Sequence, residues 1–132
     1  WARTQEIMRV VDDQISSPTS ARMLAEITAL ILAQGRDDVY GYLCEKGGLY
    51  HCAGSGSCSR YDWAKAILEL DPQKQEQMVK VLLPAKSSDF AVPANRPMVS
   101  VLDNRNLQGK FGLCQEHWKA DLIKVMGGQS CS

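Results

Sequence analysis

The chain lacks an excess of either charge, because fifteen lysines and arginines balance fifteen aspartates and glutamates among its 132 residues. A basic excess is what draws a protein to a phosphate backbone or an anionic lipid surface, so we expect neither nucleic acid nor membrane as a partner. Long hydrophobic runs are also missing. Charged residues interrupt every apolar stretch before it approaches the roughly 20 residues that a bilayer-spanning helix needs. The sequence therefore predicts no membrane segment.

Cysteines occur in an odd number and without the close pairs of a disulfide framework or a thiolate zinc site. The five are Cys44, Cys52, Cys58, Cys114 and Cys131. We therefore expect reduced thiols and a cytoplasmic location. The first residues also lack an initiator Met and the charged and apolar order of a signal peptide, which we interpret as the start of an excised piece.

The N-terminal third predicts a strand followed by a long helix. β-branched residues run through 7–15 and lead to Ser17 and Pro18, which we predict to be the cap and the first residue of the helix. Apolar residues at helical spacing continue to Gly35, where the helix ends. Because they cover most of its circumference, we expect this helix to pack against partners on two sides.

The remaining sequence alternates short strands with helices. A polar connection leads to a predicted strand at 48–53 and a tight turn at 54–58, after which Ser59 and Asp62 form the capping box of a helix. We then predict, in order, a short helix to about Met78, a strand at 79–83, an irregular segment at 84–97, a strand at 99–102, a helix capped by Asp103 and ended by Gly112, a helix holding Trp118, Leu122 and Val125, and a frayed tail from Gly127. This alternation predicts an α/β fold, a small mixed sheet with flanking helices, as one domain over 1–132.

One motif suggests catalysis but is not specific. Tyr61 and Lys65 have the Tyr-x-x-x-Lys spacing with which short-chain dehydrogenases lower the pKa of a tyrosine hydroxyl for proton transfer. Any helix with a lysine four residues after a tyrosine matches this spacing, and no cofactor motif precedes it here. We therefore assign no catalytic residue in this chain.

Two glycines suggest a cofactor loop only weakly. Gly54 and Gly56 stand between a predicted strand and a predicted helix, as in a dinucleotide phosphate loop, but Ser59 replaces the third glycine. A tight turn is the simpler interpretation. We expect no cofactor-binding residue in this chain.

Histidine and cysteine side chains occur near one another in two places along the chain. His51 precedes Cys52 and Cys58, and Cys114 precedes His117. Imidazole and thiolate are the usual zinc ligands, but neither spacing matches a compact zinc site. We expect no metal site.

The better candidates are groups suited to holding a polar ligand. Asp12, Asp13 and Gln14 bring two carboxylates and an amide to a position just before a helix N-terminus, where they could bind sugar hydroxyls or a phosphate, or could only form a turn and cap the helix. Arg96 lies in the long irregular segment, where its guanidinium could hold a diphosphate with two hydrogen bonds or could simply be solvated. The residues alone leave both alternatives open.

Three blocks of the chain together resemble the dTDP-4-dehydrorhamnose reductase family. They are residues 10–19 (VVDDQISSPT), residues 48–56 (GLYHCAGSG), and residues 93–97 (PANRP) followed by Leu102 and Asp103. Their order and rough spacing are those of the family, and the first block is the most specific. The likeness covers nearly the whole chain but matches only the C-terminal half of the family. The chain departs from the family at Ser16, where Gly is usual, and at Cys58 and Arg60.

The resemblance implies the C-terminal part of an extended short-chain-dehydrogenase, or Rossmann-type, fold. In such a reductase the Rossmann half binds NADPH or NADH, and the C-terminal half closes over a dTDP-sugar whose 4-keto group is reduced to give dTDP-L-rhamnose. The glycine fingerprint and the catalytic tyrosine and lysine of the family precede the first block. The resemblance therefore implies that this chain, without a Rossmann half, is inactive alone and has no cofactor of its own.

Carried over by position, the resemblance assigns Asp13, Gln14 and Thr19 to the substrate side of the cleft. Arg96 corresponds to the arginine that meets the nucleotide diphosphate in related extended enzymes. The partners implied are a dTDP-sugar and the missing Rossmann half, and apolar surface left uncovered by that half predicts a homo-oligomer. The alternative is a non-catalytic interaction or regulatory module on the same fold.

Overall fold

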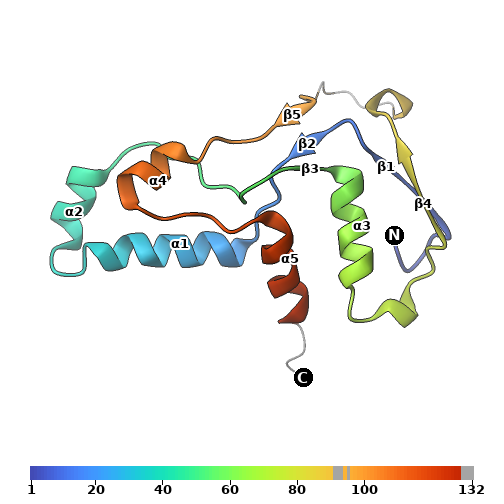
Figure 1. The fold of residues 1–132 in the computed structure, drawn as a ribbon, viewed down its shortest axis with the longest axis horizontal. Coiled ribbons are helices and arrows are strands. Elements are labelled where there is room, and N and C mark those ends of the chain that lie inside the picture. The colour runs from blue at the N-terminus through green and yellow to red at the C-terminus, as the bar shows by residue number, and fades with distance from the viewer. Residues whose placement is uncertain (91–93, 95, 129–132) are drawn as a thin grey trace.

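The computed structural model describes residues 1–90, 94 and 96–128. Its elements in chain order are β1 (Ile7–Val11), β2 (Ile15–Ser16), α1 (Ala21–Gln34), α2 (Val39–Lys46), β3 (Cys58–Ser59), α3 (Arg60–Leu70), the 3-10 helix η1 (Lys74–Glu76), β4 (Val81–Ala85), the 3-10 helix η2 (Ser87–Asp89), β5 (Val99–Ser100), α4 (Arg105–Phe111) and α5 (Trp118–Gly127). Figure 1 shows an elongated molecule with α1, α2 and α4 at one end and β1, β4 and α3 at the other.

The strands form two small sheets, one at the end that holds β1 and β4 and the other between the two ends (Figure 1). β1 and β4 pair in parallel, and the second sheet has the order β3-β2-β5, in which β2 is antiparallel to β3 and parallel to β5. Pro84 lies within β4, which is possible because a two-stranded sheet has only edge strands. The predicted α/β fold with a small mixed sheet and flanking helices is therefore confirmed.

Apolar packing is concentrated in two clusters. The larger one joins α1 to α4 through Met23, Ile27, Leu107 and Phe111. The smaller one joins α3 to α5 through Cys58, Ala66 and Trp118, and Leu122 packs against it. Only one side of α1 is buried in this chain, since its other apolar side chains are exposed: Leu24, Leu30 and Leu32.

The predicted start of the long helix is wrong by three residues. Ser20, and not Ser17, is the cap of α1, because its Oγ accepts a hydrogen bond from the Met23 N–H at 3.0 Å. The carboxylate of Asp121 in α5 fixes this serine by accepting from its Oγ at 2.7 Å and from its N–H at 3.0 Å. Pro18 consequently precedes the helix and does not begin it.

The predicted strand at 48–53 does not form. The backbone of Ala53 pairs instead with a side-chain amide, donating to Asn104 Oδ1 at 3.0 Å and accepting from Asn104 Nδ2 at 2.7 Å. The segment before it, which was predicted as a polar connection, contains the helix α2, so that prediction is wrong in part. Asp38 begins that helix by accepting a hydrogen bond from the Gly41 N–H at 2.9 Å.

Several other predictions are confirmed, some with shifted bounds. Ser59 and Asp62 form the expected capping box of α3, and Gly112 ends α4 in the left-handed conformation with φ of 67°. The helix after Pro72 is the short η1, the strand at 79–83 is β4 two residues later, and only the first half of the strand at 99–102 forms, as β5. The predicted cap Asp103 is one residue too early, since Asn104 is the N-cap of α4, although Asp103 accepts from the Arg105 N–H at 2.9 Å just before the helix. The irregular segment 84–97 contains the end of β4 and η2, and parts of it and of the tail lie outside the described residues.

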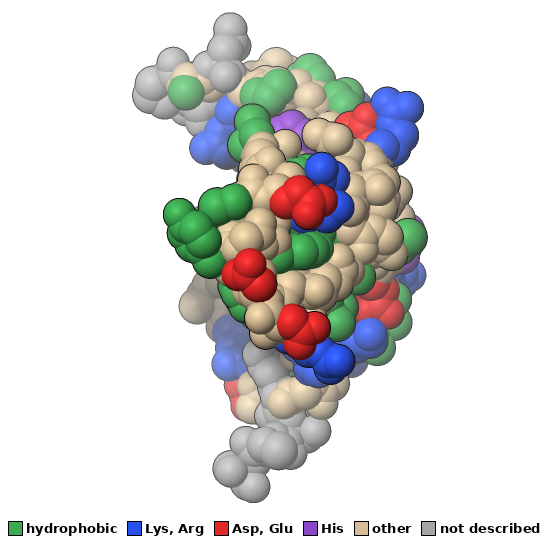
Figure 2. All heavy atoms as spheres, turned by 90° about the vertical axis from the view of Figure 1, so that its left-hand side faces the viewer, with side chains coloured by type: hydrophobic (Ala, Val, Ile, Leu, Met, Phe, Trp, Pro, Cys, Tyr) green, Lys and Arg blue, Asp and Glu red, His purple; other side chains and the backbone are tan. Residues whose placement is uncertain are grey.

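The surface carries hydrophobic side chains in several places. Figure 2 looks onto the end formed by α1, α2 and α4 and shows hydrophobic patches among side chains of both charges. Exposed residues of α2 include Val39, Tyr40 and Leu43. None of the helices described here is long and apolar enough to pass through a membrane. The cysteines of the described ranges, Cys44, Cys52, Cys58 and Cys114, are free thiols.

Candidate functional site

The turn after β1 is held by the side chain of Asp13. Its carboxylate accepts hydrogen bonds from the backbone N–H of Ser87 at 2.9 Å and from the Ser87 hydroxyl at 2.7 Å. These bonds, the backbone one first, lower the pKa of Asp13 below its usual value. Asp13 is therefore ionised at neutral pH and ties the turn to the start of η2, so that the segments following β1 and β4 lie together.

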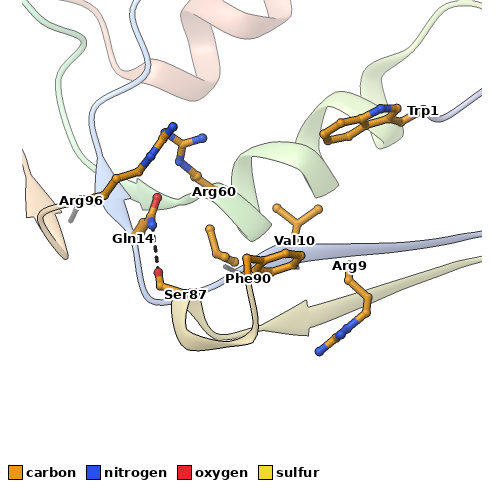
Figure 3. Close-up of a pocket in the computed structure, with 9 residues that line it drawn as sticks. Trp1, Arg9, Val10, Gln14, Arg60, Ser87, Phe90 and Arg96 are labelled. Carbon is orange, nitrogen blue, oxygen red and sulfur yellow. Dashed lines mark hydrogen bonds between the residues drawn. The ribbon is translucent and has the colours of Figure 1, made fainter. Parts of the chain in front are cut away.

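Gln14 is fixed by the same serine. Its Nε2 donates to Ser87 Oγ at 2.9 Å, which Figure 3 shows as a dashed line, and its backbone carbonyl accepts from the N–H of Arg60 at 3.2 Å. Within the described ranges its Oε1 accepts no hydrogen bond. This amide oxygen is thus free to accept a hydrogen bond from a ligand hydroxyl.

Two adjoining cavities lie around Gln14, and we call them together the Gln14 cleft. One measures about 300 Å³ and the other about 280 Å³. Both are lined by Gln14, Arg60 and Arg96. The first adds Trp1, Arg9, Val10, Val11, Ser87 and Phe90, and the second adds Ile15, Ser16, Pro97 and Ser100. The cleft therefore combines a partly apolar wall with a polar floor that carries two guanidinium groups.

The charge of this cleft is not balanced within the described part of the chain. Arg9, which lines the first cavity, pairs with Asp89, and the arginines outside the cleft also pair with carboxylates: Arg3 with Glu76, Arg22 with Glu26, Arg36 with Asp37 and Arg105 with Asp103. Arg60 and Arg96 form no ion pair or side-chain hydrogen bond with any described residue. In Figure 3 their side chains reach the same side of Gln14 from different elements. This arrangement is suited to an anionic ligand.

Thr19 lies in another place. Its hydroxyl donates to the Ser17 carbonyl at 3.0 Å and accepts from the Gly54 N–H at 2.9 Å, which fixes the segment before α1. It lines a separate cavity of about 160 Å³ between Trp63 and Trp118. The structure thus brings Gln14 and Arg96 together, places Asp13 behind them as a support, and leaves Thr19 apart.

Sequence reasoning missed Arg60 as a member of the site. Arg60 is the first residue of α3, directly after the cap Ser59, and was notable only as a departure from the family pattern. A correctly predicted cap does place Arg60 at the point where α3 leaves β3. What the sequence could not supply is the pairing of β3 with β2, which brings this point next to Gln14.

Tyr61 and Lys65, the apparent catalytic pair, belong to a different environment. The Tyr61 hydroxyl faces the Leu82 carbonyl of β4 at 3.5 Å, and neither residue is among the described residues that line the Gln14 cleft. Their assignment as non-catalytic stays a prediction.

Gly54 and Gly56 have packing reasons for being glycines. A Cβ at Gly54 would lie 2.3 Å from the Pro18 carbonyl oxygen, and one at Gly56, whose φ is 75°, would lie 2.6 Å from the His117 ring. Close packing against Pro18 and His117 therefore explains both glycines without a phosphate ligand. The absence of cofactor-binding residues in this turn stays a prediction.

Two further points concern metals and the Ser16 departure. Among the described residues, no group of three or more His, Cys, Asp or Glu side chains is placed to hold a metal ion.

Ser16 lies in β2, and no described residue other than glycine has a positive φ. The serine is therefore accommodated without backbone strain at a position where the family usually has glycine.

The sequence profile of the RmlD substrate binding domain matches residues 1–129. The chain belongs to this family. RmlD-type relatives include a dTDP-4-dehydrorhamnose reductase of Burkholderia thailandensis, 34% identical over 122 residues that make up 89% of this chain and 40% of the relative. The spore coat polysaccharide biosynthesis protein SpsK of Bacillus subtilis is 31% identical over 129 residues, 98% of this chain and 40% of that protein.

Solved structures of RmlD-type proteins agree with the fold. A dTDP-4-dehydrorhamnose reductase from Clostridium acetobutylicum matches with a TM-score of 0.76 and 31% identity, covering 98% of this chain and 41% of that one. The Bacillus anthracis enzyme, whose structure contains NADP, matches with a TM-score of 0.69 and 26% identity over 98% of this chain and 40% of that one. These neighbours have the extended short-chain-dehydrogenase fold, which confirms the predicted fold class. The chain spans about 40% of the length of the relatives it matches.

Proposed function

We propose that this chain forms the sugar-nucleotide side of the active-site cleft of an NAD(P)H-dependent reductase that converts dTDP-4-dehydrorhamnose to dTDP-L-rhamnose. One observation carries the proposal: in a chain of the RmlD family, Gln14 and Arg96 line the same cleft, and Arg96 has no acidic partner among the described residues. Both residues are also ones that the sequence predicts to bind the ligand.

The roles of the residues follow from their chemistry. The planar guanidinium of Arg96 makes two parallel hydrogen bonds to phosphate oxygens of the dTDP group. The free Oε1 of Gln14 accepts a hydrogen bond from a sugar or deoxyribose hydroxyl, and Asp13 acts through Ser87 by holding Gln14 in place. Phe90 and Val10 offer apolar surface to the nucleoside. Thr19 acts on the cleft only through the segment before α1.

In this proposal, residues other than the described ones bind the cofactor that supplies the hydride. NADPH or NADH supplies the hydride in this class of enzyme, and close packing explains the glycine turn of this chain without a dinucleotide. In the proposed division of labour a Rossmann half binds the cofactor and provides the proton donor. Residues 1–132 then act as the substrate-binding domain and are inactive alone. The free thiols agree with the reducing conditions of a cytoplasm.

The variant Arg96→Ala tests the proposal. In the intact protein that contains this chain, calorimetric titration with dTDP should show affinity about tenfold to a hundredfold weaker, because a hydrogen bond to a charged group is worth about 1.5–3 kcal/mol. Arg36→Ala is the matched control, since Arg36 is exposed, lies outside the cleft and, among the described residues, pairs with Asp37 alone at 3.8 Å. An unchanged affinity in Arg96→Ala would contradict the assignment of this site.

A second function is favoured by the exposed apolar residues of α1 and α2, including Leu30 and Tyr40. These would serve a non-catalytic interaction module, and they also support the expectation of self-association. The two functions differ in a direct assay. If the intact protein binds dTDP but oxidises neither NADPH nor NADH in the presence of dTDP-4-dehydrorhamnose, the interaction module is the better assignment. Light scattering measures whether the protein is an oligomer.

A further inference from the structure

Arg60 enters the Gln14 cleft from a different element than Arg96. It is the first residue of α3, and its backbone N–H donates to the Gln14 carbonyl at 3.2 Å, which fixes the base of its side chain beside the β1–β2 turn. Arg96 comes from the segment before β5. Both side chains line both cavities of the cleft. Two separate parts of the fold therefore deliver one guanidinium each to the same space.

The acidic residues near Arg60 are already engaged. Asp62 receives hydrogen bonds from the Ser59 hydroxyl at 2.7 Å and the Ser59 N–H at 3.4 Å, within the capping box of α3. Asp13 is held by Ser87, and Asp12 forms an ion pair with Lys86 at 2.9 Å. Within the described ranges, the two guanidinium groups are therefore not neutralised by these carboxylates. Positive groups that share a cavity repel each other, and an anion between them removes that repulsion.

The backbone at the start of α3 does not provide this anion site. Ser59 accepts the hydrogen bond of the Asp62 N–H at 3.0 Å, and the Arg60 N–H is used by Gln14. The carboxylate of Asp62 also places negative charge at this helix end. An anion in the cleft consequently depends on the side chains of Arg60 and Arg96.

We infer that Arg60 is a specificity-determining residue which, together with Arg96, makes the cleft select a nucleoside diphosphate over a nucleoside monophosphate. The inference rests on the proposed function and adds a residue to it. A diphosphate has two neighbouring phosphoryl groups, each with oxygens that a guanidinium fork can engage. A monophosphate offers only one such group, so it occupies one arginine and leaves the other unpaired. Arg60 binds and positions the ligand and takes no part in hydride or proton transfer.

The test compares dTDP, dTMP and thymidine as ligands of the intact protein by calorimetry at low salt. Arg60→Ala should lower the affinity for dTDP about tenfold, lower the affinity for dTMP less and leave the affinity for thymidine unchanged. The preference for dTDP over dTMP therefore falls. Arg60→Lys keeps the charge but loses the planar fork, and should fall between the wild type and Arg60→Ala. Lys65→Ala is the matched control, because it removes one positive charge from the same helix outside the cleft.

Each outcome separates this inference from the proposed function. If Arg96→Ala weakens dTDP while Arg60→Ala leaves the preference for dTDP over dTMP unchanged, the role of Arg60 is overturned and the proposed function stands. If neither variant lowers the affinity for dTDP, both the role of Arg60 and the proposed function are overturned. Equal losses for dTDP, dTMP and thymidine in Arg60→Ala would show damage to the cleft and would overturn the specificity role. In the double variant, losses that do not add would support one ligand group held jointly by both arginines.

Discussion

The two ends of the molecule are held together in different ways. At the end formed by α1, α2 and α4, buried apolar side chains pack around Phe111, and Tyr50 meets its ring edge-on with centroids 5.0 Å apart. At the end formed by β1, β4 and α3, which carries the cleft, polar side-chain contacts tie β1 and the turn after it to residues 86–89: Asp13 with Ser87, Lys86 with Asp12 and Arg9 with Asp89.

This difference separates stability from recognition. Burial of apolar surface supplies most of the free energy of folding, whereas exposed ion pairs contribute about 0–1 kcal/mol each. The apolar end therefore acts as the scaffold, and we expect the polar end to tolerate substitution with little loss of stability. The hydrogen bonds of the polar end instead set the positions of Gln14 and Ser87. Variants at the two ends should accordingly affect different measurements.

The two phenylalanines of the chain give the largest expected contrast. Phe111→Ala removes a buried aromatic side chain from the scaffold and should lower the free energy of unfolding by about 3–5 kcal/mol. Phe90→Ala removes a half-exposed ring from the cleft wall, which the Arg9 guanidinium approaches to 5.8 Å, and should weaken dTDP binding with little effect on stability. Urea unfolding and calorimetry measure the two effects.

These two variants would contradict the comparison if their effects were exchanged. A Phe111→Ala protein that remains folded should bind dTDP with the wild-type affinity, because Phe111 lies outside the cleft. If it binds dTDP more weakly than Phe90→Ala does, the scaffold and the recognition end are not separate in the way their packing indicates.

The tie between Asp13 and Ser87 should give a smaller, pH-dependent effect. The folded state lowers the pKa of Asp13 from 3.8, so its carboxylate stabilises the fold fully above about pH 4, and this contribution is lost as pH falls through the lowered pKa. Asp13→Asn should lower the urea midpoint at pH 7 by less than Phe111→Ala does, and should lose less stability than the wild type on acidification below pH 4.

A matched control for this variant is Asp37→Asn, because the Asp37 side chain is almost fully exposed and lies 3.8 Å from Arg36. Its unfolding midpoint should follow the wild type at every pH. If Asp13→Asn and Asp37→Asn have the same acid dependence between pH 3 and 7, the Ser87 bonds do not stabilise the turn.

Local signals explain which parts of the fold could be predicted from the sequence. The capping box of Ser59 and Asp62 spans four residues, and Gly112 ends α4 by its own conformational freedom, so both were predicted correctly. Long-range partners explain the errors. Ser20 replaces Ser17 as the cap because Asp121, 101 residues away, holds it, and the Asn104 amide takes the place of a strand partner for Ala53.

The same distinction applies to the candidate site. Gln14 and Arg96 were predicted because short motifs resemble a family, and the cleft brings them together. Thr19 is in a matched motif too, but its hydroxyl bonds to the Gly54 N–H outside the cleft. Arg60 stood out only as a departure from the family, because an arginine at a helix start is usually solvated and its approach to Gln14 depends on the pairing of β2 with β3.

Cysteine labelling offers the finest test of the comparison, since one shielded thiol lies beside each apolar cluster. Cys52 packs against the Phe111 cluster, and Cys58 is buried with Trp118, where burial raises the pKa of its thiol to about 11. At pH 8 the exposed Cys44 and Cys114 should react first with a maleimide, and Cys58 should react last because so little of it is thiolate. Peptide mass mapping follows each site.

Phe111→Ala then shows whether the two clusters open independently. Loss of the ring should loosen the scaffold around Cys52 and speed its labelling, while Cys58 keeps its wild-type rate because its partners Ala66 and Trp118 are unchanged. Labelling that accelerates equally at both thiols would mean that the molecule opens as one unit. In that case the polar end would depend on the scaffold for its stability, and loss of dTDP binding in scaffold variants would follow from unfolding rather than from the cleft.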